Sequence, residues 1–362
     1  MTNRLHTSSP STQQWAAATA DAAAQQETAH PGVAATDAPS PHLPLFALQS
    51  VAGNLTLQDL VRMRQASRHF RNAQATPAQI AQFPQGVRDR EQLKLALDAH
   101  PGVTELTLST DYAISAAHFE ALSRNASLRK LVIRNAVELH GEALRPLRGM
   151  TALTHLKLSN CLALQARDLR HCTPLAQLTS LTLNSACELT GEHDELAPLN
   201  DLRCLRSLDL SLGVFLRQEA LAPLTGLHQL STLDLSGNAN FTDAPALRNF
   251  RQLERLDLSW QERLNDQAIG AIVASNAPLR HLTLRKCNAL TDAGFATLRQ
   301  LTHLESLDLS YCGGLGAHGL DFAYAMPNLK VLDLSNCYNH DLGPFHIEAL
   351  SLARPDLQVK VQ

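Results

Sequence analysis

One six-residue pattern, Leu-x-x-Leu-x-Leu, recurs along most of the chain and constrains its fold more than any other feature. Its copies begin at Val103, Leu128, Leu153, Leu178, Leu205, Leu230, Leu253, Leu279, Leu304 and Leu329. Successive copies are 25, 25, 25, 27, 25, 23, 26, 25 and 25 residues apart, and a degenerate copy starts near Leu357. A period this regular predicts a row of stacked units, each of which buries its apolar residues against its neighbours.

Each unit is predicted to hold one strand and one helical segment. In the strand around Asp209 the flanking leucines alternate with the aspartate, so the leucines point inward and Asp209 points outward. Further along a unit, Phe295, Leu298 and Leu301 fall on one face of a helix. This pattern and period are those of a leucine-rich repeat. We therefore expect an α/β solenoid over 103–362, a horseshoe with a parallel concave sheet and convex helices.

Composition limits the classes of partner. Aromatic residues make up only 4% of the chain against 44% hydrophobic residues in total, so the core must be built from Leu and Ala. The formal net charge of −3 predicts no general attraction to nucleic acid or to anionic lipid. No stretch is apolar enough to span a membrane, and we expect no cleaved secretory signal peptide, because the first residues lack a basic segment followed by an apolar one. We expect a monomer whose partners are proteins.

The cysteines occupy a fixed place in the repeat. Cys161, Cys287, Cys312 and Cys337 each follow the first leucine of their unit by eight residues, and Cys187 follows by nine. A small polar side chain at that position is expected to turn inward and meet backbone amides, as Asn238 also would. The alternative is a metal site, but no CxxC or HxxxH pattern accompanies the cysteines. We expect reduced thiols and no metal, and the units resemble the cysteine-containing subclass of leucine-rich repeats common in F-box proteins.

The chain before the repeats divides into three segments. Residues 1–40 are rich in Ser, Thr, Gln, Ala and Pro, which predicts a disordered leader. Residues 41–75 carry the apolar spacing of short helices that are too small to form a core alone. Residues 76–102 are expected to be a helical linker and N-terminal cap, with a helix over 88–99 that ends at a Pro-Gly pair.

The segment 41–75 resembles an F-box, a small all-α module. The match is gapless through Leu43-Pro44, Leu48, Val51, Leu55, Asp59-Leu60, Ser67-Arg68 and Phe70. The resemblance departs from the usual pattern at Phe46, Ala47, Ala66 and Phe70. It implies docking on the Skp adaptor of a cullin–RING ubiquitin ligase, through an apolar face made of Leu43, Pro44, Leu48, Val51, Leu55, Leu60 and Met63. The alternative is a plain helical cap on the solenoid.

Together, the parts over 43–362 resemble the F-box/leucine-rich-repeat effectors of plant-pathogenic bacteria, among them the GALA family. The family's Gly-Ala-x-Ala-Leu-Ala signature is only echoed, for example at 141–144 and 316–320. The resemblance implies a virulence protein that a type III system secretes into the host cell cytoplasm, with 1–40 as the secretion signal. It also implies a substrate adaptor that links a host Skp–cullin ligase to a host target. A scaffold or blocker without ligase recruitment, and an endogenous bacterial repeat protein, remain alternatives.

A target-binding surface is predicted where the outward strand residues depart from the common type. Outward residues are expected at the third, fifth, seventh and eighth positions of each unit, and most are Asp or Ser. Three adjacent units depart from this with Arg255, Trp260, His281, Arg285, Lys286 and Tyr311. Exposed Trp, Tyr and Arg are the residues that carry binding energy at protein interfaces. The alternative is that Trp260 only covers the edge of a neighbouring strand.

Nothing in the sequence indicates an enzyme. None of the 16 histidines stands in a nucleophile motif, and the chain has no P-loop and no dinucleotide fingerprint. The repeats run to within a few residues of Gln362, so we expect no catalytic domain after them. We expect no catalytic residue and no cofactor.

Overall fold

The computed structural model describes residues 80–83, 93, 97, 102–109, 116–136, 139, 141–185, 187–188, 194–213, 215–337 and 341–361. These residues all belong to one compact unit, Gln49–Gln362. The predicted leader, 1–40, and the F-box-like segment, 41–75, lie outside the described residues. So does most of the helix predicted over 88–99, although Leu93 and Leu97 are described, and both are helical and buried.

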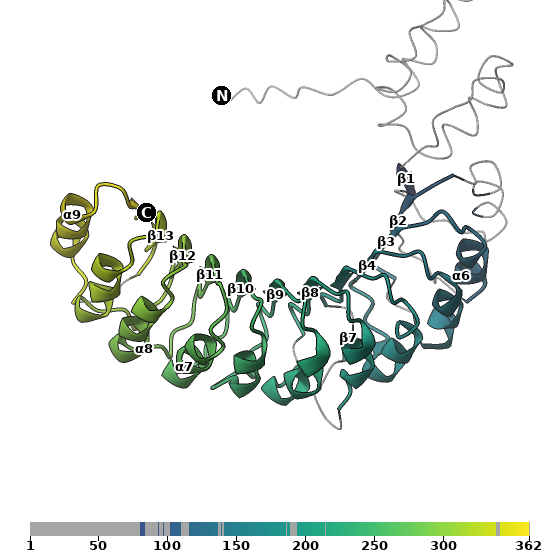
Figure 1. Ribbon diagram of the computed structural model, residues 1–362, viewed down its shortest axis with the longest axis horizontal. Helices are drawn as coiled ribbons and strands as arrows, with labels where there is room; N and C mark the ends of the chain where they lie inside the picture. Colours follow the sequence, from purple (N-terminus) through teal and green to yellow (C-terminus); the bar gives the residue numbers. More distant parts are fainter. Residues whose placement is uncertain are drawn as a thin grey trace, which may run out of the picture. The chain divides into compact units, whose positions relative to one another are not determined.

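A single parallel sheet runs through the repeats, in the order β1-β2-β3-β4-β6-β8-β9-β10-β11-β12-β13-β14 (Figure 1). Its strands are β1 (Ile80–Phe83), β2 (Glu105–Ser109), β3 (Lys130–Arg134), β4 (His155–Ser159), β6 (Ser180–Thr182), β8 (Ser207–Asp209), β9 (Thr232–Asp234), β10 (Arg255–Asp257), β11 (His281–Thr283), β12 (Ser306–Asp308), β13 (Val331–Asp333) and β14 (Gln358–Lys360). Each predicted unit supplies one strand, and the strands pair in sequence order. The predicted parallel sheet is therefore confirmed.

The first strand was not expected. The linker 76–102 was predicted to be helical, but β1 lies within it and pairs with β2 from Ile80↔Glu105 to Phe83↔Leu108. The sequence Ile-Ala-Gln-Phe shows no Leu-x-x-Leu-x-Leu pattern, so the period gave no signal there. A second, two-stranded sheet joins β5 (Leu164–Gln165) to β7 (Cys187–Glu188).

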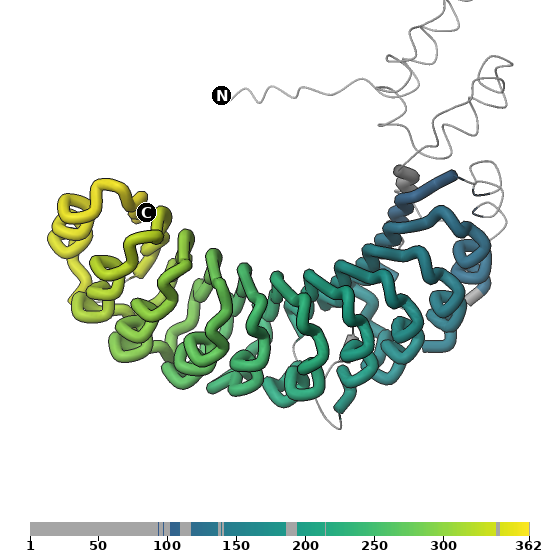
Figure 2. Tube along the Cα trace, in the orientation of Figure 1, coloured from purple at the N-terminus to yellow at the C-terminus, as the bar shows by residue number. Residues whose placement is uncertain are grey.

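Helical segments follow the strands and lie on the opposite side of each coil (Figures 1 and 2). The α-helices are α6 (Ala116–Ser123), α7 (Asp266–Ala274), α8 (Asp292–Thr297) and α9 (Pro344–Ala353). The 3-10 segments are η1 (Gly141–Gly149), η2 (Ala166–His171), η3 (Ala197–Asp201), η4 (Gln218–Gly226), η5 (Pro245–Asn249), η6 (Leu298–Gln300) and η7 (His318–Ala325). Pro146 in η1 and Pro223 in η4 favour short, tight turns because proline lacks the N–H that an α-helix needs.

The core consists of leucines stacked in register. Leu256 pairs with Leu282, which pairs with Leu307, and these side chains are at most 2% exposed. Each such leucine contributes roughly 1.5–3 kcal/mol by leaving water. The helix face predicted behind the sheet is also confirmed, since Phe295, Leu298 and Leu301 are buried. The fold is thus an interior of repeated leucine rows closed by the helical segments.

Among the described residues, the polar side chains at the ninth position of the units turn inward, as expected, but they donate hydrogen bonds to carbonyl groups. The thiols of Cys287, Cys312 and Cys337 donate to Leu258 O at 3.2 Å, Leu284 O at 3.0 Å and Leu309 O at 3.0 Å. Asn238 donates to Leu210 O and Leu235 O in the same way. Burial raises the pKa of the Cys287 thiol, and the backbone of Gln261 offsets part of this rise. In these four units the ladder therefore ties the turn to the unit before it.

Gln261 takes the same inward position where no cysteine stands. Its Nε2 donates to Leu235 O at 2.6 Å, and its side chain is fully buried. Cys161 differs from the later cysteines, because its thiol donates within its own turn, to Ser159 O at 3.6 Å.

Carboxylates join the helical sides of successive units. Asp266 accepts hydrogen bonds from the Thr291 amide at 2.9 Å and the Thr291 hydroxyl at 2.6 Å. One unit further on, Asp292 accepts from the Gly316 amide at 2.6 Å. A Cβ atom at Gly294 would overlap the Asp266 carboxylate, so glycine is required there for the close approach. This close approach accounts for the glycine in the sequence Leu290-Thr291-Asp292-Ala293-Gly294.

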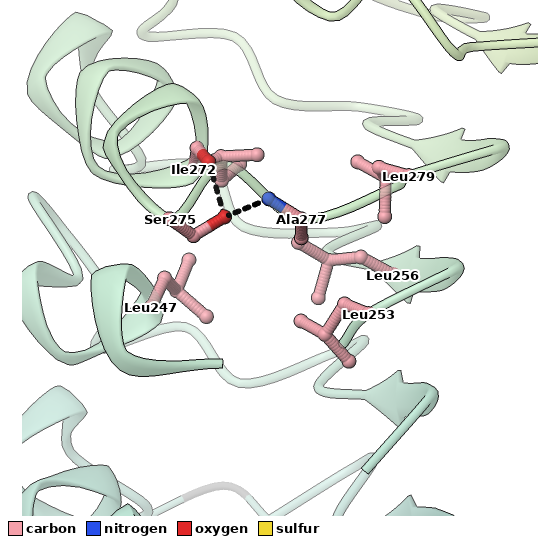
Figure 3. A pocket seen from close by; sticks show the side chains of 7 residues that line it. All are labelled: Leu247, Leu253, Leu256, Ile272, Ser275, Ala277 and Leu279. Atoms are coloured by element: carbon pink, nitrogen blue, oxygen red, sulfur yellow. Dashed lines mark hydrogen bonds between the residues drawn. The ribbon is translucent and has the colours of Figure 1, made fainter. Parts of the chain in front are cut away.

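One small apolar void interrupts the packing (Figure 3). It lies where the shortest unit, of 23 residues, meets the next one, so the five-residue η5 faces the nine-residue α7. Its lining is Leu247, Leu253, Leu256, Ile272, Ser275, Ala277 and Leu279. The Ser275 hydroxyl donates to Ile272 O at 2.6 Å and accepts from the Ala277 amide at 3.2 Å. No polar group of the lining is left for a ligand, and the void is a packing defect of the interior.

Candidate protein-binding surface

The outer face of the sheet carries an aspartate row that shapes its own turns. In β8, β9 and β10 the aspartate Oδ1 accepts from the amide and the hydroxyl of the serine two residues later, as in Asp257 and Ser259 at 2.8 and 2.5 Å. The seventh position was predicted to point outward, but Ser211, Ser259 and Ser310 are buried. The Asp-x-Ser pairs are thus turn-forming groups.

The residue after each serine position adopts a left-handed backbone conformation. These eighth positions are Asn135, Asn160, Ser185, Leu212, Gly237, Trp260, Lys286, Tyr311 and Asn336, with φ between 46° and 73°. The amides of the first eight donate to a carbonyl of the following unit, for example Trp260 to Arg285 O at 2.7 Å. The conformation is imposed by the stacking of the coils, because it directs each amide along the axis of the solenoid.

Five of these positions hold residues that the conformation disfavours, and Ser185 is the smallest of them. Asn and Gly adopt positive φ at little cost, and several units use them here. Leu212, Trp260 and Tyr311 are instead large, and they remain 52%, 49% and 41% exposed. Lys286 is the fifth. We call the row formed by Leu212, Gly237, Trp260, Lys286 and Tyr311 the turn ridge.

Two cation–aromatic contacts order the C-terminal half of the ridge. Lys286 Nζ lies 4.1 Å from the centre of the Trp260 ring, in the unit before it. Arg285 Cζ lies 4.5 Å from the centre of the Tyr311 ring, in the unit after it. Lys286 also pairs with Glu262 Oε1 at 3.2 Å. Such contacts contribute roughly 0.5–1 kcal/mol at exposed sites, so they hold both rings in place while half of each remains open.

The remaining two predicted residues lie together on the strands. Arg255 of β10 and His281 of β11 are register partners, and an Arg255 terminal nitrogen lies 3.5 Å from His281 Nε2. The structure therefore brings the six predicted residues into contact as three pairs: Arg255–His281, Lys286–Trp260 and Arg285–Tyr311. It does not test whether they bind a target.

Leu212 and Phe215 were missed by the sequence analysis. Leu212 lies over Gly237, because a Cβ atom there would come within 2.7 Å of Leu212 Cδ2. Phe215, three residues later, is 60% exposed. A signal for Leu212 existed, since it holds the same repeat position as Trp260 and Tyr311. The Skp-binding residues predicted within 43–63 lie outside the described residues.

Among the described residues, no three His, Cys, Asp or Glu side chains come together as a metal site would require. In the part of the chain that the structure describes, every helix is too short or too polar to cross a membrane.

The sheet, the leucine rows and the inward ladder together form a solenoid of leucine-rich repeats. A family model described as Leucine Rich repeat matches residues 300–321. An internalin (inlF) structure from Listeria monocytogenes is similar at 19% identity, covering 74% of this chain and 76% of that chain, with a TM-score of 0.41. A structure of the Rad7 and Elc1 complex in yeast is similar at 19% identity, covering 98% of this chain and 94% of that chain, with a TM-score of 0.44.

Proposed function

We propose that this protein is a substrate adaptor that holds a host target protein on the turn ridge and the adjoining strands, and links it to a host Skp–cullin ubiquitin ligase. The observation that carries the target-binding half is the placement of large side chains in left-handed turns. Trp260 and Tyr311 occupy backbone positions that Asn or Gly fill in other units, and they remain largely exposed.

Energetics favour a binding role for these residues. A left-handed conformation costs a residue with a Cβ roughly 1–2 kcal/mol, and exposed rings recover little of this from burial. Strained residues of this kind persist where a function requires them. Tryptophan, tyrosine and arginine contribute most of the energy at protein interfaces, and Arg285 lies against Tyr311 in the ridge.

The test of target binding exchanges the ridge residues for the asparagine that other units use. A Trp260→Asn, Tyr311→Asn double variant should fold at least as stably as the wild type, since asparagine tolerates the turn. It should lose the proteins that the wild type captures from a plant cell extract. Thermal unfolding and quantitative pull-down measure the two effects.

A matched control is Tyr324→Asn, which removes an equally exposed ring from the helical side of the coil, in η7. Undiminished capture by the double ridge variant, or equal loss in the control, would contradict the assignment of the ridge.

The ligase half of the proposal rests on the resemblance of 43–70 to an F-box. Its apolar residues, headed by Leu43 and Pro44, would dock on a Skp protein. Purified full-length protein should bind a purified plant Skp in a direct pull-down, and Leu43→Ala with Pro44→Ala should abolish this. If the double variant still bound Skp, the assignment of this docking face would be wrong.

A scaffold or blocker that acts by occupying its target is the second candidate function. The turn ridge supports this function equally, because the ridge is evidence for target binding and not for ligase recruitment. Two results would favour it over the adaptor: no contact with Skp, and host activity that persists after deletion of residues 1–75.

The site of action is part of the proposal. The Ser-, Thr- and Gln-rich composition of residues 1–40 supports secretion by a type III system into the host cell cytoplasm. Fusion of 1–40 to a reporter should direct the reporter into host cells, and should fail in a strain that lacks the secretion system. Export in that strain would exclude this route.

A further inference from the structure

The third residues of the repeat units form a row across the sheet, and two pairs of basic side chains stand in register on it, Lys130–His155 and Arg255–His281. Arg255 and His281 are register partners at the start of β10 and β11, with an Arg255 terminal nitrogen 3.5 Å from His281 Nε2. A guanidinium can only donate, so His281 Nε2 is the acceptor in this contact and the ring proton lies on Nδ1. Arg255 is exposed and His281 is half-buried.

Elsewhere on this row, charge is either absent or compensated. Lys130 of β3 lies 3.2 Å from the Glu105 carboxylate of β2. The residues on either side of the basic pair are Thr232 and Ser306, which carry hydroxyls. Among the residues that the structure describes, no carboxylate lies within ion-pairing distance of Arg255 or His281. The hydrogen-bond donors of this pair therefore have no acidic acceptor beside them.

Two acidic groups, one on the same strand and one on the next unit but one, are engaged in other contacts. Asp257, two residues along β10, binds the amide and hydroxyl of Ser259 through its Oδ1. Glu305, two units further on, pairs with Arg280 and, at 2.8 Å, with Lys330. The donors of Arg255 therefore remain available to a group brought by a partner.

We infer that Arg255 and His281 hold an acidic group, a carboxylate or a phosphate, of the protein bound on the turn ridge. This inference rests on the proposed function, because the pair and the ridge lie on the same units. Arg255 offers planar, parallel N–H donors that match either anion. His281 needs only to move its proton from Nδ1 to Nε2 to become a second donor, with no change in net charge.

The row of aspartates beside this pair restricts where an acidic group of the partner can bind. The carboxylates of Asp234, Asp257 and Asp308 lie on the same face, at the fifth position of their units. They would repel an anion placed over them, so an acidic group of the partner is confined to the hydroxyl-flanked row of Arg255 and His281. A partner segment that is acidic at this point and apolar toward Trp260 fits the surface.

The test follows the ring signals of His281 by NMR in full-length protein labelled at histidine, with inorganic phosphate and acetate as probes. A saturable shift of the His281 signals is expected with at least one probe, and Arg255→Ala should weaken that binding about tenfold, since a hydrogen bond to a charged group is strong. Arg263→Ala, which removes an exposed arginine from the same unit, should leave it unchanged.

The two anions distinguish the source of the acidic group. Tighter binding of phosphate indicates a phosphorylated partner, whereas equal binding of acetate indicates a carboxylate. An unresponsive His281, or a response that Arg255→Ala does not weaken, would overturn the inference. The Trp260→Asn, Tyr311→Asn variant separates this result from the proposed function, because it removes target capture and leaves the anion response intact.

Discussion

At the scale of single residues, the carboxylates of the sheet act on their own turns. Asp257 accepts two hydrogen bonds from Ser259, and both burial and the charges of Asp234 and Asp308 raise the pKa of its carboxyl. Stacking identical aspartates one strand apart therefore has a cost, which the hydrogen bonds within each turn offset.

Replacement of Asp257 separates these two effects. Asp257→Ala removes the acceptor and should lower the free energy of unfolding by about 1–2 kcal/mol, whereas Asp257→Asn keeps an acceptor oxygen. Folding raises this carboxyl pKa, so the stability associated with the protonated group is present at low pH and is lost as the pH rises through the folded pKa. The free energy of unfolding of Asp257→Asn, measured relative to the wild type by urea unfolding, should therefore increase between pH 3.5 and pH 7. A stability difference that decreases toward pH 7 would contradict this.

The inward thiols should be chemically inert in the native protein. Burial raises the pKa of Cys161 and of Cys312 to about 12, and only the thiolate reacts with disulfide reagents. At pH 8 the native chain should modify these two cysteines far more slowly than the urea-unfolded chain, as mass spectrometry after timed labelling would show. Equal labelling rates in both states would mean that these turns are open.

At the scale of elements, glycine positions distinguish crowded from open helical faces. Gly294 in α8 lies against the Asp266 carboxylate, which holds Thr291. Gly270 in α7 has no atom within 4 Å of where a Cβ would be. The same substitution thus tests inter-unit packing at one site and helix propensity at the other.

Alanine at these two glycines should shift stability in opposite directions. Gly294→Ala forces the Asp266 carboxylate away from Thr291 and should cost on the order of 1–3 kcal/mol. Gly270→Ala should stabilise by about 0.5–1 kcal/mol, because alanine restricts the unfolded chain. Thermal unfolding of both variants measures the difference. If Gly294→Ala were neutral, the Asp266 contact would not link the units.

At the scale of the whole repeat unit, each coil contacts its neighbours in sequence order. The strands pair only with the strands before and after them, so stability should be local and additive along the array. Leu282 stands in the middle of the C-terminal half and is 1% exposed.

Leu282→Ala should therefore unfold a neighbourhood and leave distant units unchanged. Its expected cost is about 2–5 kcal/mol, and hydrogen exchange should accelerate in peptides that cover β10–β12 but not in those that cover β2–β3. Exchange that accelerates equally in both regions would show one cooperative core.

The sequence by itself determined the period, the strand in each unit and the leucines of the core, because side-chain alternation and a fixed repeat length leave one way to bury those residues. It also selected Trp260 and Tyr311 as exceptional. Only the tertiary structure decided what stands beside them: Arg285 reaches Tyr311 and Lys286 reaches Trp260 across units. The left-handed turn at these positions, and the strand β1, likewise depend on hydrogen bonds between coils. Residues about 25 apart become neighbours only when the coils stack, and no local pattern records that contact.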